Sequence, residues 1–363
     1  MKALVAMSGG VDSSVAAALM LDQGYDVIGV TLKQWEDPDG SMPVAGCCTL
    51  SDAEDARRVA AQLDIPYYVL DYVEEFTAAV VEPFAQGYLD GLTPNPCIEC
   101  NRNVRFDALL DRTSALGCDV LVTGHHARIA ETDGVFRLRR AVDNTKDQSY
   151  VLHMLDQQAL SKVKLPIGEM TKSKVRDRAR ALGLRTAEKP DSQDICFVTS
   201  GDYRDFLRAT HPEVAAPGDV LNSEGDIVGK HPGTAGYTIG QRKGLGVAVG
   251  EPRYVLDIEP RERTITIGTY EDLLVSECVV TDMRFVHLAP AVGDDVSVKV
   301  RYRSEPVEAT ITQAGTAAGD QWRFAFREPQ VRPAPGQTLV MYEGEYVLGG
   351  GTIVDERRHV GTR

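Results

Sequence analysis

The chain has 363 residues, a hydrophobic fraction of 43% and a formal net charge of −14 at pH 7. This length predicts roughly two or three domains that are stable without disulfides, and the negative charge excludes general nucleic-acid affinity, so an RNA partner would need a local basic surface. No apolar run reaches membrane-spanning length, and the N-terminus leads directly into a predicted strand. We therefore expect a cytoplasmic protein without a signal peptide or membrane contact.

Strands and helices alternate over the first half of the chain. A strand over Lys2–Met7, a helix over Ser13–Gln23 and a strand over Asp26–Thr31 form the first predicted βαβ unit. The alternation continues through the predicted helices Asp52–Leu63, Val73–Tyr88 and Val104–Leu116 and the predicted strands Tyr67–Leu70 and Val120–Thr123. This pattern predicts an α/β fold with a doubly wound parallel sheet, whose ligands bind at the carboxyl ends of the strands.

The pattern changes after about residue 210, where short β-prone runs lie between Gly/Pro turns and no long helix is evident. From about Cys278 onward such runs follow at close spacing, which predicts a small antiparallel β-barrel. We therefore divide the chain into an N-terminal α/β domain (1–207), a small β-rich central domain (208–273) and a C-terminal barrel (274–363).

A glycine-rich segment joins the first predicted strand to the first helix. It reads Ser8-Gly9-Gly10-Val11-Asp12-Ser13-Ser14. A tight turn before a helix directs backbone N–H groups and the positive end of the helix dipole at an anion, and hydroxyls add further donors. The segment lacks the lysine of a Walker loop and is not Gly-x-Gly-x-x-Gly. The alternative is a helix cap made by Asp12 or Ser13, but a cap alone does not call for two glycines and three hydroxyls.

Two cysteine neighbourhoods carry the other chemistry. Asn95-Pro96-Cys97-Ile98-Glu99-Cys100 is predicted to lie on a loop between helical segments, and Asp191-Ser192-Gln193-Asp194-Ile195-Cys196 follows a Lys-Pro pair. Polar segments keep thiols accessible. A single Cys-x-x-Cys is compatible with a redox pair, half a zinc site or iron–sulfur ligands. The adjacent Cys47-Cys48 pair is too tight to complete a zinc site.

A basic stretch lies between Ser161 and Arg185. It holds Lys162, Lys164, Lys172, Lys174, Arg176, Arg178, Arg180 and Arg185 against only Glu169 and Asp177. Clustered basic side chains can neutralise phosphates whatever the charge of the whole chain. The alternative is a solvated helix face, which is the more common role of such a run.

Taken together, these segments resemble those of the bacterial tRNA-specific 2-thiouridylase family, which belongs to the PP-loop ATPases. The resemblance covers essentially the whole chain. Besides the two cysteine segments it includes residues 6–15, Gly29-Val30-Thr31-Leu32-Lys33, Thr123-Gly124-His125-His126-Ala127-Arg128, Lys146-Asp147-Gln148-Ser149-Tyr150 and Tyr237-Thr238-Ile239-Gly240-Gln241-Arg242-Lys243-Gly244-Leu245-Gly246. Members of this family replace the C2 oxygen of the wobble uridine of tRNA with sulfur.

The resemblance implies an ATP site, a target-base site and a tRNA surface. ATP, with Mg²⁺, would bind at Ala6, Met7, Ser8, Gly9, Gly10, Val11, Asp12, Ser13, Leu32 and Gly124. Catalysis would use Asp12, Cys100 as nucleophile and Cys196 as persulfide carrier. Asn95, Pro96 and Cys97 would surround a flipped-out base, and His125, Lys146, Asp147, Gln148, Arg301, Tyr302 and Gln337 would contact tRNA of the Lys, Glu or Gln type. The resemblance also implies a sulfur-carrier protein or cysteine desulfurase as donor, and we expect a monomer.

One position departs from the family pattern. Many members carry Asp where this chain has Cys97, so the role of that position is open here. Cys97, Cys100 and Cys196 could instead hold a 4Fe–4S cluster whose open iron binds sulfide, although we favour the persulfide route because the sequence shows ligands and no iron. His126 replaces a common Tyr, which we interpret as a local packing change.

Two other functions are compatible with parts of this pattern. A small-molecule PP-loop ligase shares the glycine-rich segment but needs neither Cys100 with Cys196 nor a β-barrel. A nucleotide-binding iron–sulfur or redox sensor would show no turnover. Release of pyrophosphate on adding ATP and unmodified tRNA distinguishes the sensor from the enzyme.

Overall fold

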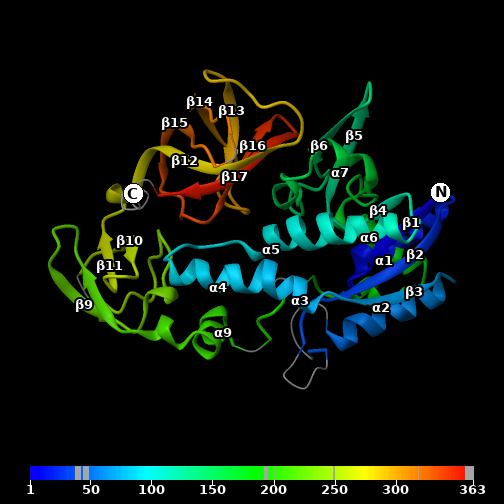
Figure 1. The fold of residues 1–363 in the computed structure, drawn as a ribbon, viewed down its shortest axis with the longest axis horizontal. Coiled ribbons are helices and arrows are strands. Elements are labelled where there is room, and N and C mark those ends of the chain that lie inside the picture. The colour runs from blue at the N-terminus through cyan, green and yellow to red at the C-terminus, as the bar shows by residue number, and fades with distance from the viewer. Residues whose placement is uncertain are drawn as a thin grey trace.

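The computed structural model describes residues 1–36, 42–43, 49–191, 195–199, 201–247, 250–317 and 319–355. Cys47, Cys48 and Ser192–Asp194 lie outside this described part. Figure 1 shows an α/β body that carries the N-terminus, a smaller β body around β9 (Ile227–His231), and a barrel above them. The predicted fold class, an α/β domain followed by two β domains, is confirmed.

Among the described residues, five parallel strands form the N-terminal sheet in the order β3-β2-β1-β4-β7. These strands are β1 (Lys2–Ala6), β2 (Asp26–Lys33), β3 (Tyr67–Asp71), β4 (Val120–Val122) and β7 (Val163–Lys164). Ala3, Leu4 and Val5 are all fully buried. The run in β1 is therefore continuously apolar because helices cover both faces of the sheet.

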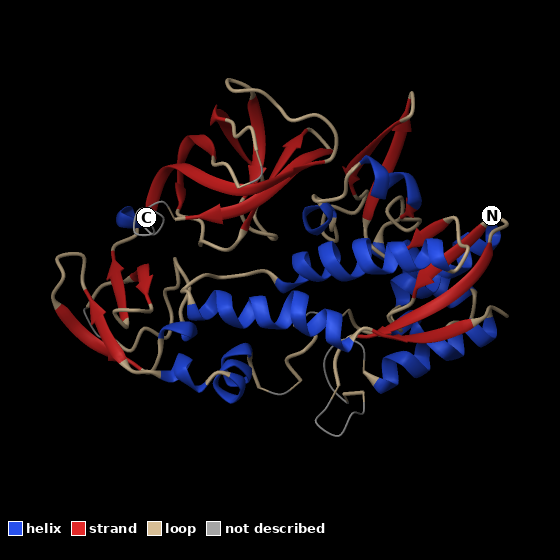
Figure 2. Ribbon diagram, viewed as in Figure 1, coloured by secondary structure: helices blue, strands red, loops and turns tan. Residues whose placement is uncertain are grey.

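Helices pack on both sides of this sheet, as Figure 2 shows. The α-helices of the first 210 residues are α1 (Val11–Asp22), α2 (Leu50–Gln62), α3 (Val73–Phe76), α4 (Glu82–Leu89), α5 (Pro96–Glu99), α6 (Leu109–Ala115), α7 (Gln157–Lys162), α8 (Lys172–Ala181) and α9 (Tyr203–Thr210). Side chains of α1, α2 and α8 share one apolar cluster with Ala3 and Val5. Those of α4 and α6 share another with Leu4. The strand order reverses between β1 and β4, which places the expected ligand crevice there.

Two of the predicted helical regions each contain a π-helical segment. A π-helical turn, Thr77–Val81, joins α3 to α4, and a second, Cys100–Ala108, joins α5 to α6. The second helical run therefore begins at Pro96 rather than at Val104. The prediction that Cys97 and Cys100 lie on a loop was wrong, because Pro96 occupies the first helical turn, where its missing N–H costs nothing.

The central domain is a small sheet in the order β10-β11-β8-β9 among the described residues. Its strands are β8 (Gly218–Leu221), β9, β10 (Tyr254–Glu259) and β11 (Thr264–Gly268). The predicted boundary after residue 207 falls inside α9. This helix therefore leads from the α/β domain directly into the central one.

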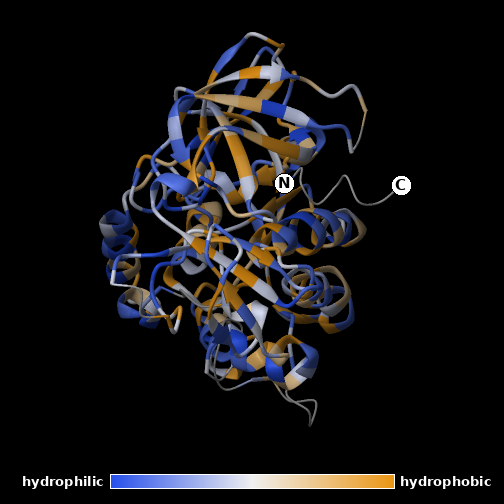
Figure 3. Ribbon diagram, turned by 90° about the vertical axis from the view of Figure 1, so that its left-hand side faces the viewer, coloured by the Kyte–Doolittle hydropathy of each residue, from blue (hydrophilic) through white to orange (hydrophobic). Residues whose placement is uncertain are grey.

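The C-terminal domain is a closed antiparallel barrel, as the run spacing predicted. In the described chain its strands are β12 (Leu274–Phe285), β13 (Asp295–Lys299), β14 (Val307–Gln313), β15 (Trp322–Val331), β16 (Thr338–Glu343) and β17 (Tyr346–Val354), and pairing of β12 with β17 closes it. Trp322, Phe324 and Phe326 alternate into its core. Hydrophobic and hydrophilic residues accordingly alternate along the barrel strands in Figure 3.

The barrel is attached to the α/β domain by strand pairing and by shared core. A hairpin of the α/β domain, β5 (Ala127–Thr132) and β6 (Val135–Arg140), extends the barrel sheet through β17. Val340 and Tyr342 of β16 belong to the same apolar cluster as α4 and α6. Of the helices in the described part, none combines the length and apolarity needed to cross a membrane.

Candidate functional site

The glycine-rich segment forms a loop between the carboxyl end of β1 and the start of α1. The Ser8 N–H donates to Ser13 Oγ at 3.1 Å, and Ser14 Oγ donates to the Gly10 carbonyl at 2.7 Å. Gly10 is the N-cap and supplies no side-chain cap. The first amides of α1 are therefore available to an anion, as the sequence predicted.

Gly9 and Gly124 fix the shape of this loop. Gly9 has φ +71°, and a Cβ there would lie 2.1 Å from the Asp52 carbonyl oxygen. Gly124 follows β4, and a Cβ there would lie 2.6 Å from the Ser13 amide nitrogen. The loop is thus held between two neighbouring backbones, at the point where the strand order reverses.

Replacement of Gly124 tests this packing. We expect Gly124→Ala to weaken ATP binding at least ~10-fold, because the new methyl group must displace the Ser13 backbone and shifts of about 1 Å can cost ~100-fold in function. Isothermal titration calorimetry with ATP measures the dissociation constant. Gly236→Ala is the matched control, since its methyl group would meet only the Arg204 side chain, at 3.7 Å or more. Equal ATP affinity in both variants would contradict the close packing.

The remaining predicted nucleotide residues lie around the loop but differ in exposure. Met7, Val11 and Leu32 are buried, so their contribution to a ligand site comes through the backbone. Thr31 Oγ1 donates to the Met7 carbonyl at 2.6 Å and so ties β2 to the loop. Ser8 is exposed and can reach a ligand directly.

Asp12 is the centre of a charged network that sequence reasoning missed. Its carboxylate is 3.2 Å from His126 Nε2 and 2.7 Å from Lys172 Nζ. The same ammonium lies 2.7 Å from Asp191, which Lys146 also contacts, at 2.8 Å. The only signals in the sequence were the basic stretch, which we assigned to RNA, and the unusual His126, which we interpreted as a packing change.

The network lowers the pKa values of both carboxyl groups. Burial alone would raise the pKa of Asp12, but hydrogen bonds from His126 and Lys172 outweigh it and hold that pKa below its usual range. For Asp191, hydrogen bonds from Lys146 and Lys172 likewise overcome burial and lower the pKa to about 2. Both carboxylates are therefore ionised at neutral pH.

The basic stretch is less positive than its composition suggested. Arg176 contacts Asp191, Arg178 contacts Asp22, and Arg180 contacts Asp177 and Glu188. Lys172 is only 9% exposed, whereas Lys174 on the same helix is exposed. Much of the predicted phosphate-neutralising surface is thus already paired with acidic groups or turned toward the loop.

The three candidate cysteines differ in environment. Cys97 is exposed, and Asn95 caps the helix by accepting the Cys97 N–H at 3.1 Å. Cys100 is buried, with Gln34 Nε2 3.2 Å from its sulfur. Cys196 is half-buried and packs on the apolar cluster that includes Cys100. The two predicted reactive thiols therefore border one cluster although they are 96 positions apart in the chain.

A metal centre at these cysteines does not fit the described residues. Within the described ranges, no group of three His, Cys, Asp or Glu side chains is arranged to hold a metal ion. Cys97 faces solvent whereas Cys100 lies in the core. We therefore derive no step through an iron–sulfur cluster.

The predicted tRNA-contacting residues of the α/β domain are largely engaged within the protein. Lys146 binds Asp191, and Gln148 Oε1 accepts the His126 N–H at 2.8 Å. Asp147 is buried and accepts the amides of Ala141 and Ser149. His125 is also buried, 2.8 Å from Thr123 Oγ1, and desolvation lowers its pKa to about 3. His125 is thus uncharged at neutral pH.

Two of the three predicted tRNA-contacting residues of the barrel, Gln337 and Tyr302, lie near the Asn95–Cys100 segment. Gln337 Nε2 donates to the Thr93 carbonyl at 2.5 Å, just before Asn95. Tyr302 packs on Tyr150 with ring centroids 5.9 Å apart. Burial raises the pKa of Tyr302, and the neighbouring Asp147 and Cys97 add to this effect. Arg301 is exposed beside Gly240. The barrel and the α/β domain therefore meet where the target base is expected.

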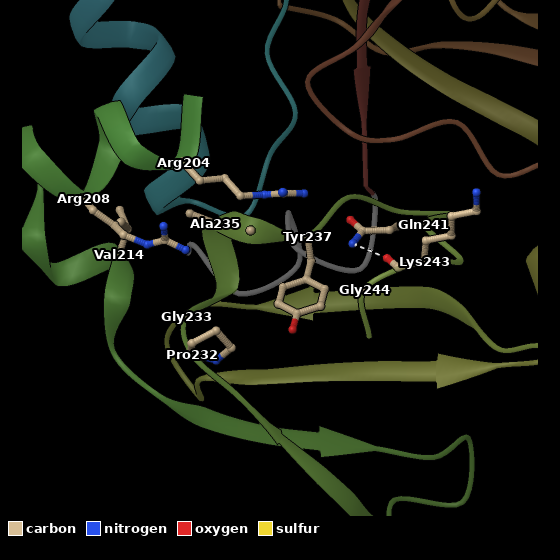
Figure 4. Close-up of a pocket in the computed structure, with 11 residues that line it drawn as sticks. Arg204, Arg208, Val214, Pro232, Gly233, Ala235, Tyr237, Gln241, Lys243 and Gly244 are labelled. Atoms are coloured by element: carbon tan, nitrogen blue, oxygen red, sulfur yellow. Dashed lines mark hydrogen bonds between the residues drawn. The ribbon is translucent and has the colours of Figure 1, made fainter. Parts of the chain in front are cut away.

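A cavity of about 410 Å³ lies in the central domain. Arg204 and Arg208 of α9 line one side, and Gln241 and Lys243 of the Tyr237–Gly244 segment line the other, as Figure 4 shows. Gln241 Nε2 donates to the Lys243 carbonyl at 2.9 Å, which folds that segment into a turn. Its basic lining suits an RNA phosphate.

These observations define a PP-loop nucleotide-binding enzyme with two appended β domains. Family models agree: residues 1–200 match "tRNA methyl transferase HUP domain", 204–269 match "tRNA methyl transferase PRC-barrel domain", and 275–353 match "Aminomethyltransferase beta-barrel domain". The chain belongs to the tRNA-specific 2-thiouridylase family.

Relatives in this family match the chain over nearly its whole length. The chain is 48% identical to the tRNA-specific 2-thiouridylase MnmA of Chloroflexus aggregans over 96% of its own length and 97% of the relative's. Identity is 46% with that of Carboxydothermus hydrogenoformans, over 97% of both chains. It is 44% with that of Clostridioides difficile, over 97% and 98%. The family models name methyl transferases, whereas these full-length relatives are thiouridylases.

Proposed function

We propose that this chain, as a tRNA 2-thiouridylase, uses ATP to activate the C2 oxygen of the wobble uridine and then replaces that oxygen with sulfur. The products are 2-thiouridine in tRNA, AMP and pyrophosphate. The observation that carries the proposal is the phosphate loop (Ser8–Ser14), which contains Asp12, in a domain where Cys196 packs on the apolar cluster that includes Cys100. The names of the full-length relatives agree with it.

The first step is adenylation. The C2 oxygen of uridine attacks the α-phosphorus of ATP, the bond to the bridging oxygen breaks, and pyrophosphate leaves with that electron pair. Ser8, Ser13 and the first amides of α1 bind the phosphates. Asp12 and Ser13 offer the oxygen ligands that Mg²⁺ prefers, and Mg²⁺ would neutralise phosphate charge. The step converts a poor leaving group into AMP.

The second step transfers sulfur. A persulfide on Cys196 supplies the sulfur that attacks C2 and expels AMP. Cys100 then attacks the Cys196 sulfur, or attacks it first to release hydrosulfide, and in either order a Cys100–Cys196 disulfide balances the two electrons. An external thiol must reduce this disulfide before the next turnover. The two cysteine segments must approach each other for this step.

The partners follow from this chemistry. A sulfur-carrier protein or cysteine desulfurase would load the persulfide, and a tRNA for Lys, Glu or Gln would present its wobble uridine between Asn95–Cys97 and the barrel. Tyr302 and Gln337 lie on the barrel side of this junction, and Arg301 lies beside Gly240 of the central domain. The reaction requires the reducing conditions of the cytoplasm, and we propose that a monomer performs it.

A reconstituted reaction tests the function. Purified protein, ATP, an unmodified glutamate tRNA transcript and a cysteine desulfurase with cysteine should yield 2-thiouridine, detected by mass spectrometry of the nucleosides, and AMP in equal amount. A transcript with cytidine at the wobble position is the control and should yield neither. Formation of ADP in place of AMP would contradict the proposed adenylation.

A further inference from the structure

Lys172 is the first residue of α8, and both its backbone amide and its side-chain ammonium have partners within the protein. Its amide donates to Asp143 Oδ2 at 2.9 Å, and Thr171 caps the helix. Its side chain is almost wholly buried, and the ammonium lies 2.7 Å from both Asp12 and Asp191. A buried charge is costly unless it is paired, so this arrangement fixes the ammonium beside the phosphate loop.

The second carboxylate, Asp191, is itself fixed by other cations. Lys146 contacts it at 2.8 Å and Arg176 at 3.3 Å. Arg176 also donates to the carbonyls of Ala187 and Lys189, so its guanidinium is bound in place. Asp191 would therefore retain Lys172 even when the ammonium exchanges its contact with Asp12 for another anion.

The position of Asp12 indicates which anion that is. Asp12 lies in the first turn of α1, where the uncapped amide N–H groups can donate to phosphate oxygens. An ammonium in contact with Asp12 is therefore at the mouth of the loop. Bound nucleotide phosphates carry more negative charge than one carboxylate and would compete with Asp12 for Lys172.

We infer that Lys172 is a catalytic residue of the adenylation step, which contacts the departing pyrophosphate, and that Asp191 is the residue that positions it. The inference rests on the proposed ATP-dependent function. As the oxygen–phosphorus bond to uridine forms and the α–β bridge breaks, negative charge grows on the bridging oxygen. A preorganised ammonium at this place stabilises that charge. This role distinguishes the buried Lys172 from the exposed Lys174 of the same helix.

Single-turnover release of pyrophosphate from ATP and unmodified tRNA tests the inference. Lys172→Met is expected to lower the release rate by ~100-fold or more. Lys2→Met, which removes an exposed lysine at the amino end of β1, opposite the end that carries the phosphate loop, is expected to stay within about twofold of wild type. A wild-type rate in Lys172→Met would overturn the inference. Absence of release in the wild-type protein would instead overturn the proposed function.

Two further variants separate chemistry from folding. Lys172→Met/Asp191→Asn removes one cation and one anion together, so it leaves the buried charge balanced if the single variant does not fold. It should show the same loss, and a wild-type rate would again overturn the inference. Asp191→Asn alone is expected to lower kcat ~10-fold with little change in the KM for ATP, and Asp191→Glu to restore part of it. Equal changes in kcat and KM for both substitutions would mark Asp191 as merely structural.

Discussion

Cys196→Ser is expected to abolish 2-thiouridine formation while pyrophosphate release in a single turnover continues at the wild-type rate. The serine hydroxyl cannot carry a persulfide, whereas the phosphate loop lies in another segment and is left intact. Mass spectrometry of tRNA nucleosides measures the first quantity, and a coupled pyrophosphate assay measures the second.

The other cysteines provide the controls for this experiment. Cys118 is buried between α6 and β4, near Lys2 at the amino end of β1, whereas the phosphate loop follows the carboxyl end of that strand, so Cys118→Ser should leave thiolation measurable. Cys97→Ser should leave persulfide loading on Cys196 intact, whereas an iron–sulfur route would need Cys97 as a ligand. Thiolated tRNA from the Cys196→Ser enzyme with a physiological donor would disprove the persulfide mechanism.

Asp12→Ala is expected to lower pyrophosphate release by ~1000-fold while Cys196 still accepts a persulfide. The substitution removes the carboxylate that contacts both His126 and Lys172, and with it the proposed ligand for Mg²⁺. Release is measured under saturating ATP and tRNA, and persulfide loading by mass spectrometry of the protein after incubation with a desulfurase and cysteine.

Asp22→Ala is the matched control, because Asp22 is an exposed carboxylate at the other end of the same helix. It should leave both activities near wild type. Loss of persulfide loading in Asp12→Ala would show that the nucleotide site and the sulfur-carrying segment do not act independently. The link from Asp12 through Lys172 to Asp191 is the contact through which such dependence would pass.

The contact between barrel and α/β domain bears on how the enzyme recognises tRNA. Gln337 binds the backbone just before the cysteine helix, and Arg128 of the hairpin lies 2.5 Å from Glu345 of the barrel. Both contacts join the barrel to the α/β domain, and the Gln337 contact holds the barrel near the Asn95–Cys97 segment. Binding of tRNA would replace the Gln337 contact if that residue also contacts RNA as we propose.

Local patterns were sufficient for most of the secondary structure. The helix predicted over Val73–Tyr88 is observed as one continuous helical run, in which a π-helical turn joins α3 to α4. The barrel was predicted from the close spacing of β-prone runs after Cys278. The start of the helix that carries Cys97 (α5) was predicted too far along the chain, because Pro96 was interpreted as a helix breaker although proline is favoured in a first helical turn.

The sequence by itself determined the class of fold, the phosphate loop and the two cysteine segments, because each depends on residues that are adjacent in the chain. Only the tertiary structure decided the partners of Asp12, since Lys172 contacts it from 160 positions away and is itself bound by Asp191, 179 positions from Asp12. It also decided that His125 is buried and uncharged. Burial and charge pairing depend on which surfaces pack together, and the spacing of residues along the sequence does not show this.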